Sequence, residues 1–123
     1  MFGTDCLESE CEAARVAAVE GCCYASPYND ARVVAGQGTI GLELLAQLPA
    51  GVAAADVVVF VPVGGGGLIS GIAGVLKAAS ADFTVVGCQP EASQVMKLSV
   101  EAGRIVEAES LDTLSDGTAG ASR

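Results

Sequence analysis

The stretch VVVFVPVGGGGLISGIAGVL, residues 57–76, decides the fold of this chain. Residues 57–63 form a continuous apolar run, which is typical of a buried parallel strand. Residues 68–76 have the apolar spacing of a helix, and the four glycines at 64–67 separate the two elements. A strand, a glycine turn and a helix let several backbone N–H groups converge at the positive end of a helix dipole. The order therefore predicts a cup that binds a phosphate group.

The flanking sequence continues the alternation of strands and helices. Residues 83–88 form a second apolar run, and we expect helices at about 38–48 and from Pro90 to Gly103. Apolar strands that alternate with amphipathic helices predict an α/β fold, with a parallel sheet covered by helices on both faces. Two strands are fewer than such a sheet usually has, and the turn-rich tail ends without a further element, so we expect an incomplete piece of a larger fold.

The N-terminal part predicts a separate, smaller region. Asp5 and Glu8 have the spacing of a capping box, and the helix that follows ends at Gly21. Residues 22–25 predict a short strand, in which the adjacent Cys22 and Cys23 are small buried residues of a reducing compartment. The turn signal at 26–30 then predicts a boundary, with residues 1–30 ending a small domain and residues 31–123 belonging to a large one.

Composition excludes several classes of function. Fifteen acidic and six basic residues give a formal charge of −9, which disfavours nucleic acid and anionic membranes as partners. No apolar run is long enough for a membrane helix, and no export signal is visible at the N-terminus, so we expect a cytoplasmic protein. The chain has five cysteines and no histidine, which excludes a Cys/His zinc site and any mechanism with a histidine base.

Two simpler interpretations compete with the phosphate cup. Residues 36–41 satisfy the G-x-G-x-x-G dinucleotide pattern, with Asp56 downstream, but the preceding residues make a poor strand and Asp56 comes before its strand. This disfavours a nicotinamide-dependent oxidoreductase. The four glycines at 64–67 also fit a plain turn, although a plain turn needs only one or two.

Three segments, in order, resemble the fold-type II enzymes that use pyridoxal 5'-phosphate (PLP), specifically the serine/threonine dehydratase and serine racemase family. Residues 35–43 (AGQGTIGLE) are similar to the family's A-G-Q-G-T-I helix start, and residues 61–71 (VPVGGGGLISG) to its phosphate loop. Residues 113–117 (TLSDG) are similar to its T-x-[AS]-D-G segment. The resemblance covers nearly the whole chain and implies a tryptophan synthase β-like fold.

The resemblance also implies a cofactor site. The phosphate of PLP would accept hydrogen bonds from the backbone amides of the four glycines, with Leu68 opening the helix beneath. Tyr28 and Gly117 are two further candidates, although packing at a domain edge explains Tyr28 equally well and a turn explains Gly117. The cofactor-binding candidates are therefore Gly64, Gly65, Gly66, Gly67, Leu68, Tyr28 and Gly117.

No catalytic residue is expected in this chain. The family's Ser-x-Lys segment, which carries the Schiff-base lysine, and its Ser/Gly-Asn-His segment lie upstream of anything present, and its late Ser or Cys lies beyond Arg123. Lys77 is about 15 Å along the helix behind the glycine loop, too far to replace that lysine. Lys97 is expected to be exposed.

A strong metal site is not expected either. Some family members hold a divalent cation at positions that here look like Gln89 and Val95, and these give a hard cation too little charge even if Ser93 lends a carbonyl. This favours a dehydratase over a metal-activated racemase.

The resulting hypothesis is a fragment, inactive alone, of a PLP-dependent L-serine/L-threonine dehydratase, an ammonia-lyase that forms a 2-oxo acid and ammonia and is a homo-oligomer when complete. A serine racemase of the same family is one alternative. The other is a noncatalytic protein that binds a phosphate ligand or another subunit. The sequence does not distinguish serine from threonine as the substrate.

Overall fold

The structure is a computed structural model, which describes residues 2–3 and 6–119. The chain divides into two compact units, Pro27–Gln89 and a second unit made of Met1–Ser26 with Pro90–Arg123. The boundary predicted between residues 30 and 31, and the assignment of 31–123 to a large domain, remain predictions.

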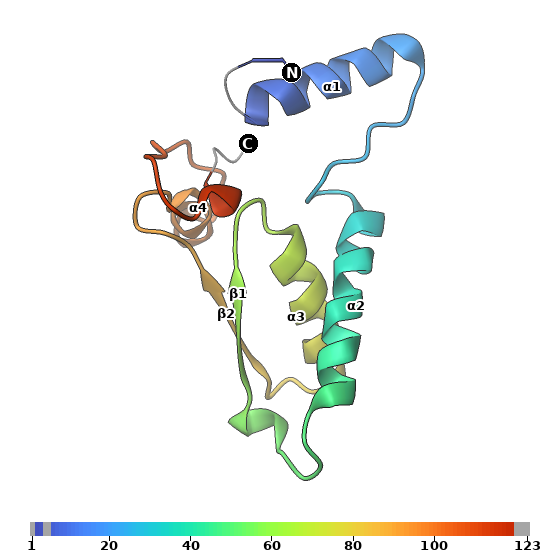
Figure 1. Cartoon of the computed structure of the whole chain (residues 1–123), viewed down its shortest axis with the longest axis vertical. Helices are drawn as coiled ribbons and strands as arrows, with labels where there is room; N and C mark the ends of the chain where they lie inside the picture. The colour runs from blue at the N-terminus through green and yellow to red at the C-terminus, as the bar shows by residue number, and fades with distance from the viewer. Residues whose placement is uncertain (1, 4–5, 120–123) are drawn as a thin grey trace. The chain divides into compact units, whose positions relative to one another are not determined.

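The unit Pro27–Gln89 contains a pair of parallel strands with two long helices beside it. In chain order it comprises α2 (Ala31–Gln47), a short 3-10 turn (Ala54–Asp56), β1 (Val58–Pro62), α3 (Gly67–Ala79) and β2 (Thr84–Cys88). The strands pair from Val58↔Thr84 to Pro62↔Cys88, and α3 is the crossover between them (Figure 1). The predicted α/β class with a parallel sheet is confirmed.

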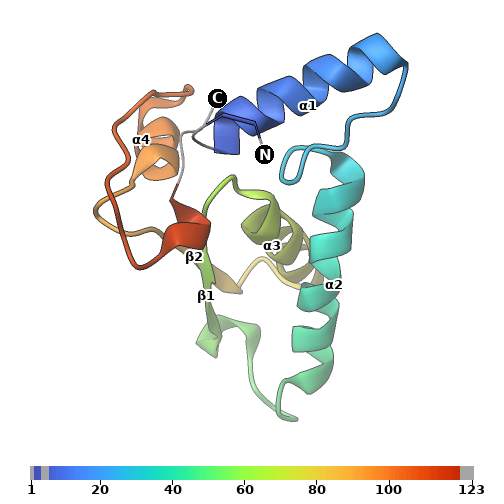
Figure 2. The same cartoon turned by 45° about the horizontal axis from the view of Figure 1, so that its top comes forward.

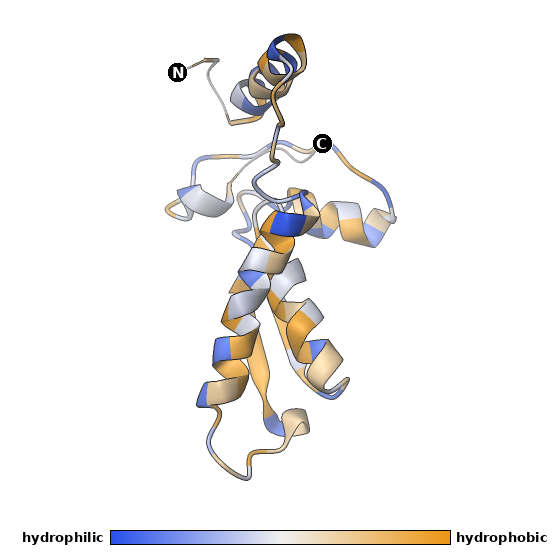
Figure 3. Ribbon diagram, turned by 90° about the vertical axis from the view of Figure 1, so that its right-hand side faces the viewer, coloured by the Kyte–Doolittle hydropathy of each residue, from blue (hydrophilic) through white to orange (hydrophobic). Residues whose placement is uncertain are grey.

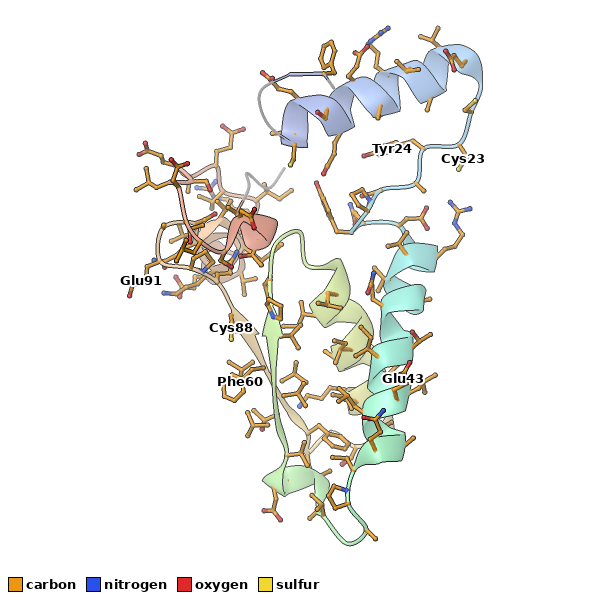
Figure 4. All side chains as sticks on the ribbon, viewed as in Figure 1. Cys23, Tyr24, Glu43, Phe60, Cys88 and Glu91 are labelled. Atoms are coloured by element: carbon orange, nitrogen blue, oxygen red, sulfur yellow. The ribbon has the colours of Figure 1, made fainter. Side chains whose placement is uncertain are left out.

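The core of this unit lies between one face of the strands and the helices. Val61, Ile72, Leu76 and Phe83 are buried together, and leucines of α2 pack against them. The strands carry almost only hydrophobic residues (Figure 3). Val61 is 2% exposed, whereas the neighbouring Phe60 is 68% exposed and points away from the helices (Figure 4). Within the described residues, α2 and α3 therefore cover one face of the sheet.

Helices α2 and α3 run side by side in the same direction and pack through glycines (Figure 1). A Cβ atom at Gly71 would meet the carbonyl oxygen of Val34 and lie 2.6 Å from the backbone nitrogen of Gly38. A Cβ at Gly41 would lie 2.9 Å from the Cβ of Val75. The two backbones thus approach more closely than a side chain at these positions allows.

This packing explains two glycines of the G-x-G-x-x-G pattern, Gly38 and Gly41, whereas a Cβ at Gly36 would have nothing within 4 Å. All six residues of the pattern lie inside α2, where they form no turn after a strand. A dinucleotide site requires the glycines to connect a strand to the start of a helix. The position of the pattern within a helix removes the basis for the nicotinamide interpretation.

The predicted start of this helix at about residue 38 was wrong. Helix α2 begins at Ala31, because Asp30 caps it with a side-chain oxygen that accepts a hydrogen bond from the backbone N–H of Arg32. Gly38 and Gly41 are tolerated in the helix because they are needed for its contact with α3.

The second unit contains α1 (Cys6–Glu20), α4 (Val95–Ala102) and a short 3-10 turn (Asp116–Thr118). The expected capping box involves Asp5, which lies outside the described residues. Helix α1 ends at Gly21, which has a φ of +68°. Helix α4 ends as expected at Gly103, but it starts at Val95, because residues 90–93 close a turn through the amide of Ser93 and the carbonyl of Pro90.

Two expectations for residues 22–25 were wrong. These residues form no strand, because no second strand pairs with them in the described part of the chain, and Cys22 donates its backbone N–H back to Ala17 of α1. Cys22 and Cys23 are exposed rather than buried. None of the helices in the described ranges is both long and apolar enough to cross a membrane.

Candidate functional site

The glycine turn leaves the sheet from a fixed point at the end of β1. Figure 2 shows this turn leading from β1 into α3. The N–H of Val63 donates to the carbonyl of Cys88 at 2.9 Å, and the side-chain amide of Gln89 donates to the carbonyl of Val63 at 3.1 Å. Both backbone polar groups of Val63 are thus held by the residues that end and follow β2.

The other end of the turn is the N-terminus of α3. Gly66 is the N-cap residue and has a left-handed backbone, with φ +88° and ψ −8°. The first helical bond runs from the N–H of Ser70 to the carbonyl of Gly66 at 3.0 Å, so the amides of Gly67, Leu68 and Ile69 have no helical acceptor. No side chain in the described part of the chain caps this end. Amides without an acceptor at the positive end of a helix can donate hydrogen bonds to an anion.

The first turn of α3 is held by packing beneath it. Gly67 is buried, and Leu68 and Ile69 pack against the hydrophobic core. The amides of these three residues therefore belong to a fixed element. This satisfies the main requirement for anion binding, which is that the donors are in place before the ligand arrives.

Tyr28 lies directly against the turn, although it is far from it in the sequence. A Cβ at Gly65 would meet Cγ and Cδ1 of the Tyr28 ring and lie 2.7 Å from Cδ2. A Cβ at Gly67 would lie 2.8 Å from the Cα and 3.0 Å from the carbonyl oxygen of Tyr28. Gly65 and Gly67 are thus required by their contact with Tyr28. Gly66 is required because its own backbone is left-handed.

Gly117 and the glycine turn belong to different units of the chain. It lies in the second unit, inside the 3-10 turn Asp116–Thr118, where its N–H donates to the carboxylate of Asp116 at 2.7 Å. A Cβ at Gly117 would have nothing within 4 Å. Neither a positive φ nor a close contact requires glycine at this position.

The residues considered above as replacements for the Schiff-base lysine, or as metal ligands, have other roles in the structure. Lys77 lies in the last turn of α3, far from the glycine turn, and its ammonium donates to the carbonyl of Ala81 at 2.8 Å. Lys97 is exposed and donates to the side chain of Gln94 at 3.3 Å. Gln89 donates to Val63, and Val95 is buried.

Asp30, which precedes α2, is a further residue of note that was not predicted from the sequence. Its carboxylate accepts hydrogen bonds from the backbone N–H of Arg32 at 2.8 Å and from the Arg32 guanidinium at 2.6 Å and 3.0 Å. These bonds, the side-chain ones first, lower the pKa of Asp30 from 3.8 to about 2. The available signal was an aspartate immediately before a helical pattern, which is a common N-cap.

The composition of the turn fits the phosphate group of a cofactor. Residues 64–70 include no acidic side chain that would repel an anion, and the three amides at the start of α3 are available donors. The same residues offer no group that could bond covalently to a cofactor ring. The parallel strand, the glycine turn and the helix have the order found in α/β proteins that receive a phosphate at this point of the fold.

Comparison with known proteins identifies the family. The family model described as pyridoxal-phosphate dependent enzyme matches residues 2–123, and the chain belongs to this family. It is 44% identical over 108 residues to an L-threonine ammonia-lyase of Thermotoga maritima, covering 87% of this chain and 25% of that protein. It is 37% identical over 118 residues to the catabolic L-threonine dehydratase of Escherichia coli, covering 95% of this chain and 34% of that protein.

Solved structures agree with this assignment. The processed form of threonine deaminase isoform 2 from Solanum lycopersicum superposes with a TM-score of 0.83 at 36% identity, covering 98% of this chain and 34% of that structure. Maize serine racemase gives a TM-score of 0.78 at 32% identity, covering 94% of this chain and 35% of that structure. The fold is that of the fold-type II enzymes, and the chain spans about a third of these structures.

Proposed function

We propose that this chain is the part of a PLP-dependent L-threonine/L-serine dehydratase that holds the phosphate of the cofactor. The observation that carries the proposal is the helix end at Gly66, whose left-handed glycine leaves three amides unpartnered. When bound, PLP supplies an electron sink that lets an amino acid lose its α-proton and then its β-hydroxyl. The chain's own contribution is to bind and orient the cofactor.

In this proposal the donors are backbone groups. The amides of Gly64, Gly65, Gly66 and Gly67 converge on the phosphate, and the amide of Leu68 adds a donor from the first turn of α3. Side chains are absent over these four glycines, so the anion can approach the backbone closely. The dipole of α3, a helix of 13 residues, favours the negative charge.

The reaction and substrate are proposed from the relatives. Several curated relatives carry the names of threonine ammonia-lyases or dehydratases, which supports elimination over racemisation. The serine racemase structures keep racemisation as the alternative. Gln89 is a neutral amide at a position where some members hold a divalent cation, which favours the members that need no cation.

The same proposal predicts the activity of the chain alone and the nature of the complete enzyme. The chain has no Ser-x-Lys segment, so we expect it to release no ammonia from threonine or serine when alone. The complete enzyme would be a cytoplasmic homo-oligomer of amino-acid metabolism that acts on a small-molecule substrate.

The test is phosphate binding by the chain itself. Backbone amide NMR signals are followed while inorganic phosphate, and separately PLP, is added to the wild type, Gly66→Ala and Gly74→Ala. Gly74 lies on α3, and a Cβ there would have nothing within 4 Å, so Gly74→Ala is the matched control. We expect shifts centred on residues 64–69 in the wild type and the control, and weaker binding in Gly66→Ala. Shifts elsewhere, or none, would contradict the proposal.

A noncatalytic, subunit-binding role is the second candidate. It is supported by the exposed outer face of the sheet, where Val58 is 49% and Phe60 is 68% exposed. An apolar face of this kind is covered by another part of a protein or by a partner. Co-purification of the chain with a longer family member, without phosphate binding by the chain, would favour this role over the first.

A further inference from the structure

We propose that Tyr28 is the positioning residue of the glycine turn, and that its ring fixes Gly65 and Gly67 in the conformation that binds phosphate. This inference rests on the proposed function for its consequence in ligand binding. It goes beyond that function because it assigns to Tyr28 an action through the loop, with no contact to the cofactor required.

The contact between Tyr28 and the turn is direct. The base of the ring, at Cγ, Cδ1 and Cδ2, occupies the position that a side chain of residue 65 would take. The backbone of Tyr28 occupies the corresponding position at residue 67. Gly65 and Gly67 therefore both contact Tyr28. This contact limits the conformations of Gly66, which lies between them.

Tyr28 is itself held in place from the other side. Two residues later, the carboxylate of Asp30 caps α2, so Tyr28 immediately precedes a capped helix. Helix α2 is locked to α3 by the contact of Gly71 with Val34 and Gly38. The ring thus lies in the turn that leads directly into α2, and α2 is packed against α3, the helix that the glycine turn begins.

A turn of four glycines needs such a support. Glycine loses more backbone freedom on ordering than any other residue, so a free glycine loop would have to be ordered at the moment of binding. A ring that restricts the loop beforehand removes part of this cost and raises the affinity. The contacting atoms are ring carbons near Cβ, so phenylalanine at residue 28 would keep this contact with the turn.

The first experiment compares Tyr28→Ala with Tyr28→Phe in the full chain. Two readouts are recorded: the NMR order parameters of the backbone amides of residues 64–67, and the affinity for inorganic phosphate. We expect Tyr28→Ala to lower the order parameters in the turn and to weaken phosphate binding by about tenfold, since ordering must then occur on binding. Tyr28→Phe should retain both properties. Unchanged order parameters in Tyr28→Ala would overturn the inference.

The second experiment uses the steric relation between residues 28 and 65. Gly65→Ala should weaken binding because its methyl meets the ring, and adding Tyr28→Ala should restore part of that loss. The matched control is Gly67→Ala, whose methyl would meet the backbone of Tyr28 at Cα and the carbonyl oxygen. Loss of the ring cannot relieve that contact. Equal rescue of both variants, or of neither, would overturn the inference.

These readouts separate the two proposals. If the turn has high order parameters in the wild type and lower ones in Tyr28→Ala, but no phosphate binds, the positioning role stands and the proposed function fails. If phosphate binds equally to the wild type and Tyr28→Ala, the proposed function stands and the positioning role fails.

Discussion

Helices α2 and α3 lie side by side in the same direction, yet their N-termini solve the same electrostatic problem in opposite ways. Helix α2 carries its own anion, the carboxylate of Asp30, which accepts a bond from the Arg32 amide. Helix α3 begins with Gly66, which has no side chain, and no described side chain takes its place. The N-terminus of α2 is thus capped by a carboxylate of the chain, whereas the N-terminus of α3 keeps amides without an acceptor.

The difference shows how a binding site is separated from a stabilising cap. A cap adds to helix stability, and a glycine N-cap in a left-handed conformation gives up that contribution. Helix α3 replaces it by packing, through Gly71 against α2 and through Ile72 and Leu76 in the core. The glycine turn is therefore held in place by the packing of α3. Among the described residues, no side chain caps the amides at the start of this helix.

The largest expected effect comes from separating the two helices. Gly71→Ala places a methyl against the backbone at Val34 and Gly38, which cannot move as a flexible side chain can. We expect the free energy of unfolding to fall by about 3 kcal/mol, because overpacking against backbone forces the helices apart. Urea unfolding followed by circular dichroism measures this loss.

The matched control for this change is Gly74→Ala, one turn further along the same helix. A Cβ at Gly74 would have nothing within 4 Å, so this variant should gain about 0.5–1 kcal/mol from helix propensity alone. Similar stabilities for the two variants would show that the glycines do not set the distance between α2 and α3.

The next effect is on the cup itself, at Gly66. A non-glycine residue in the left-handed conformation costs about 1–2 kcal/mol, so Gly66→Ala should weaken phosphate binding by about tenfold. Asparagine adopts this conformation more readily, so Gly66→Asn should fall between the wild type and Gly66→Ala. Isothermal titration with inorganic phosphate measures the three affinities. If Gly66→Ala bound as tightly as the wild type, the left-handed cap would have no part in binding.

The elements around this cup could be predicted because their signals are local. The apolar run at 57–63 and the glycines at 64–67 correctly indicated β1, the turn and the start of α3. The run at 83–88 correctly indicated β2. A parallel strand pair joined by a helix follows from this order, since buried parallel strands are apolar throughout.

The remaining errors came from contacts between distant residues. The glycines at 36–41 suggested the beginning of a helix, because the need of Gly38 and Gly41 for space at α3 is visible only once α3 is packed against them. Residues 22–25 have strand-like composition but no partner strand in the described chain, and a strand requires a partner. The contact of Tyr28 with Gly65 likewise joins two segments that no sequence pattern connects.

The cap of α2 gives a smaller effect, confined to stability. Asp30→Ala removes the acceptor for the Arg32 amide, whereas Asp30→Asn keeps a neutral acceptor in the same place. We expect urea midpoints in the order wild type, Asp30→Asn and Asp30→Ala, with a smaller loss than that of Gly71→Ala. A midpoint for Asp30→Ala equal to that of the wild type would mean that the helix end is satisfied by solvent.

The smallest effect is the dependence of this cap on pH. The pKa of Asp30 is lowered in the folded chain from 3.8 to about 2, chiefly by the hydrogen bond from the Arg32 side chain. A lowered folded pKa stabilises the fold above the unfolded value, and this contribution is lost as the pH falls from about 4 to about 2. The difference in urea midpoint between the wild type and Asp30→Asn should therefore be constant near neutral pH and shrink over this acid range. A difference that stays constant across the range would mean that the charge of Asp30 adds nothing to its role as a cap, and that the two helix ends differ only in having or lacking an acceptor.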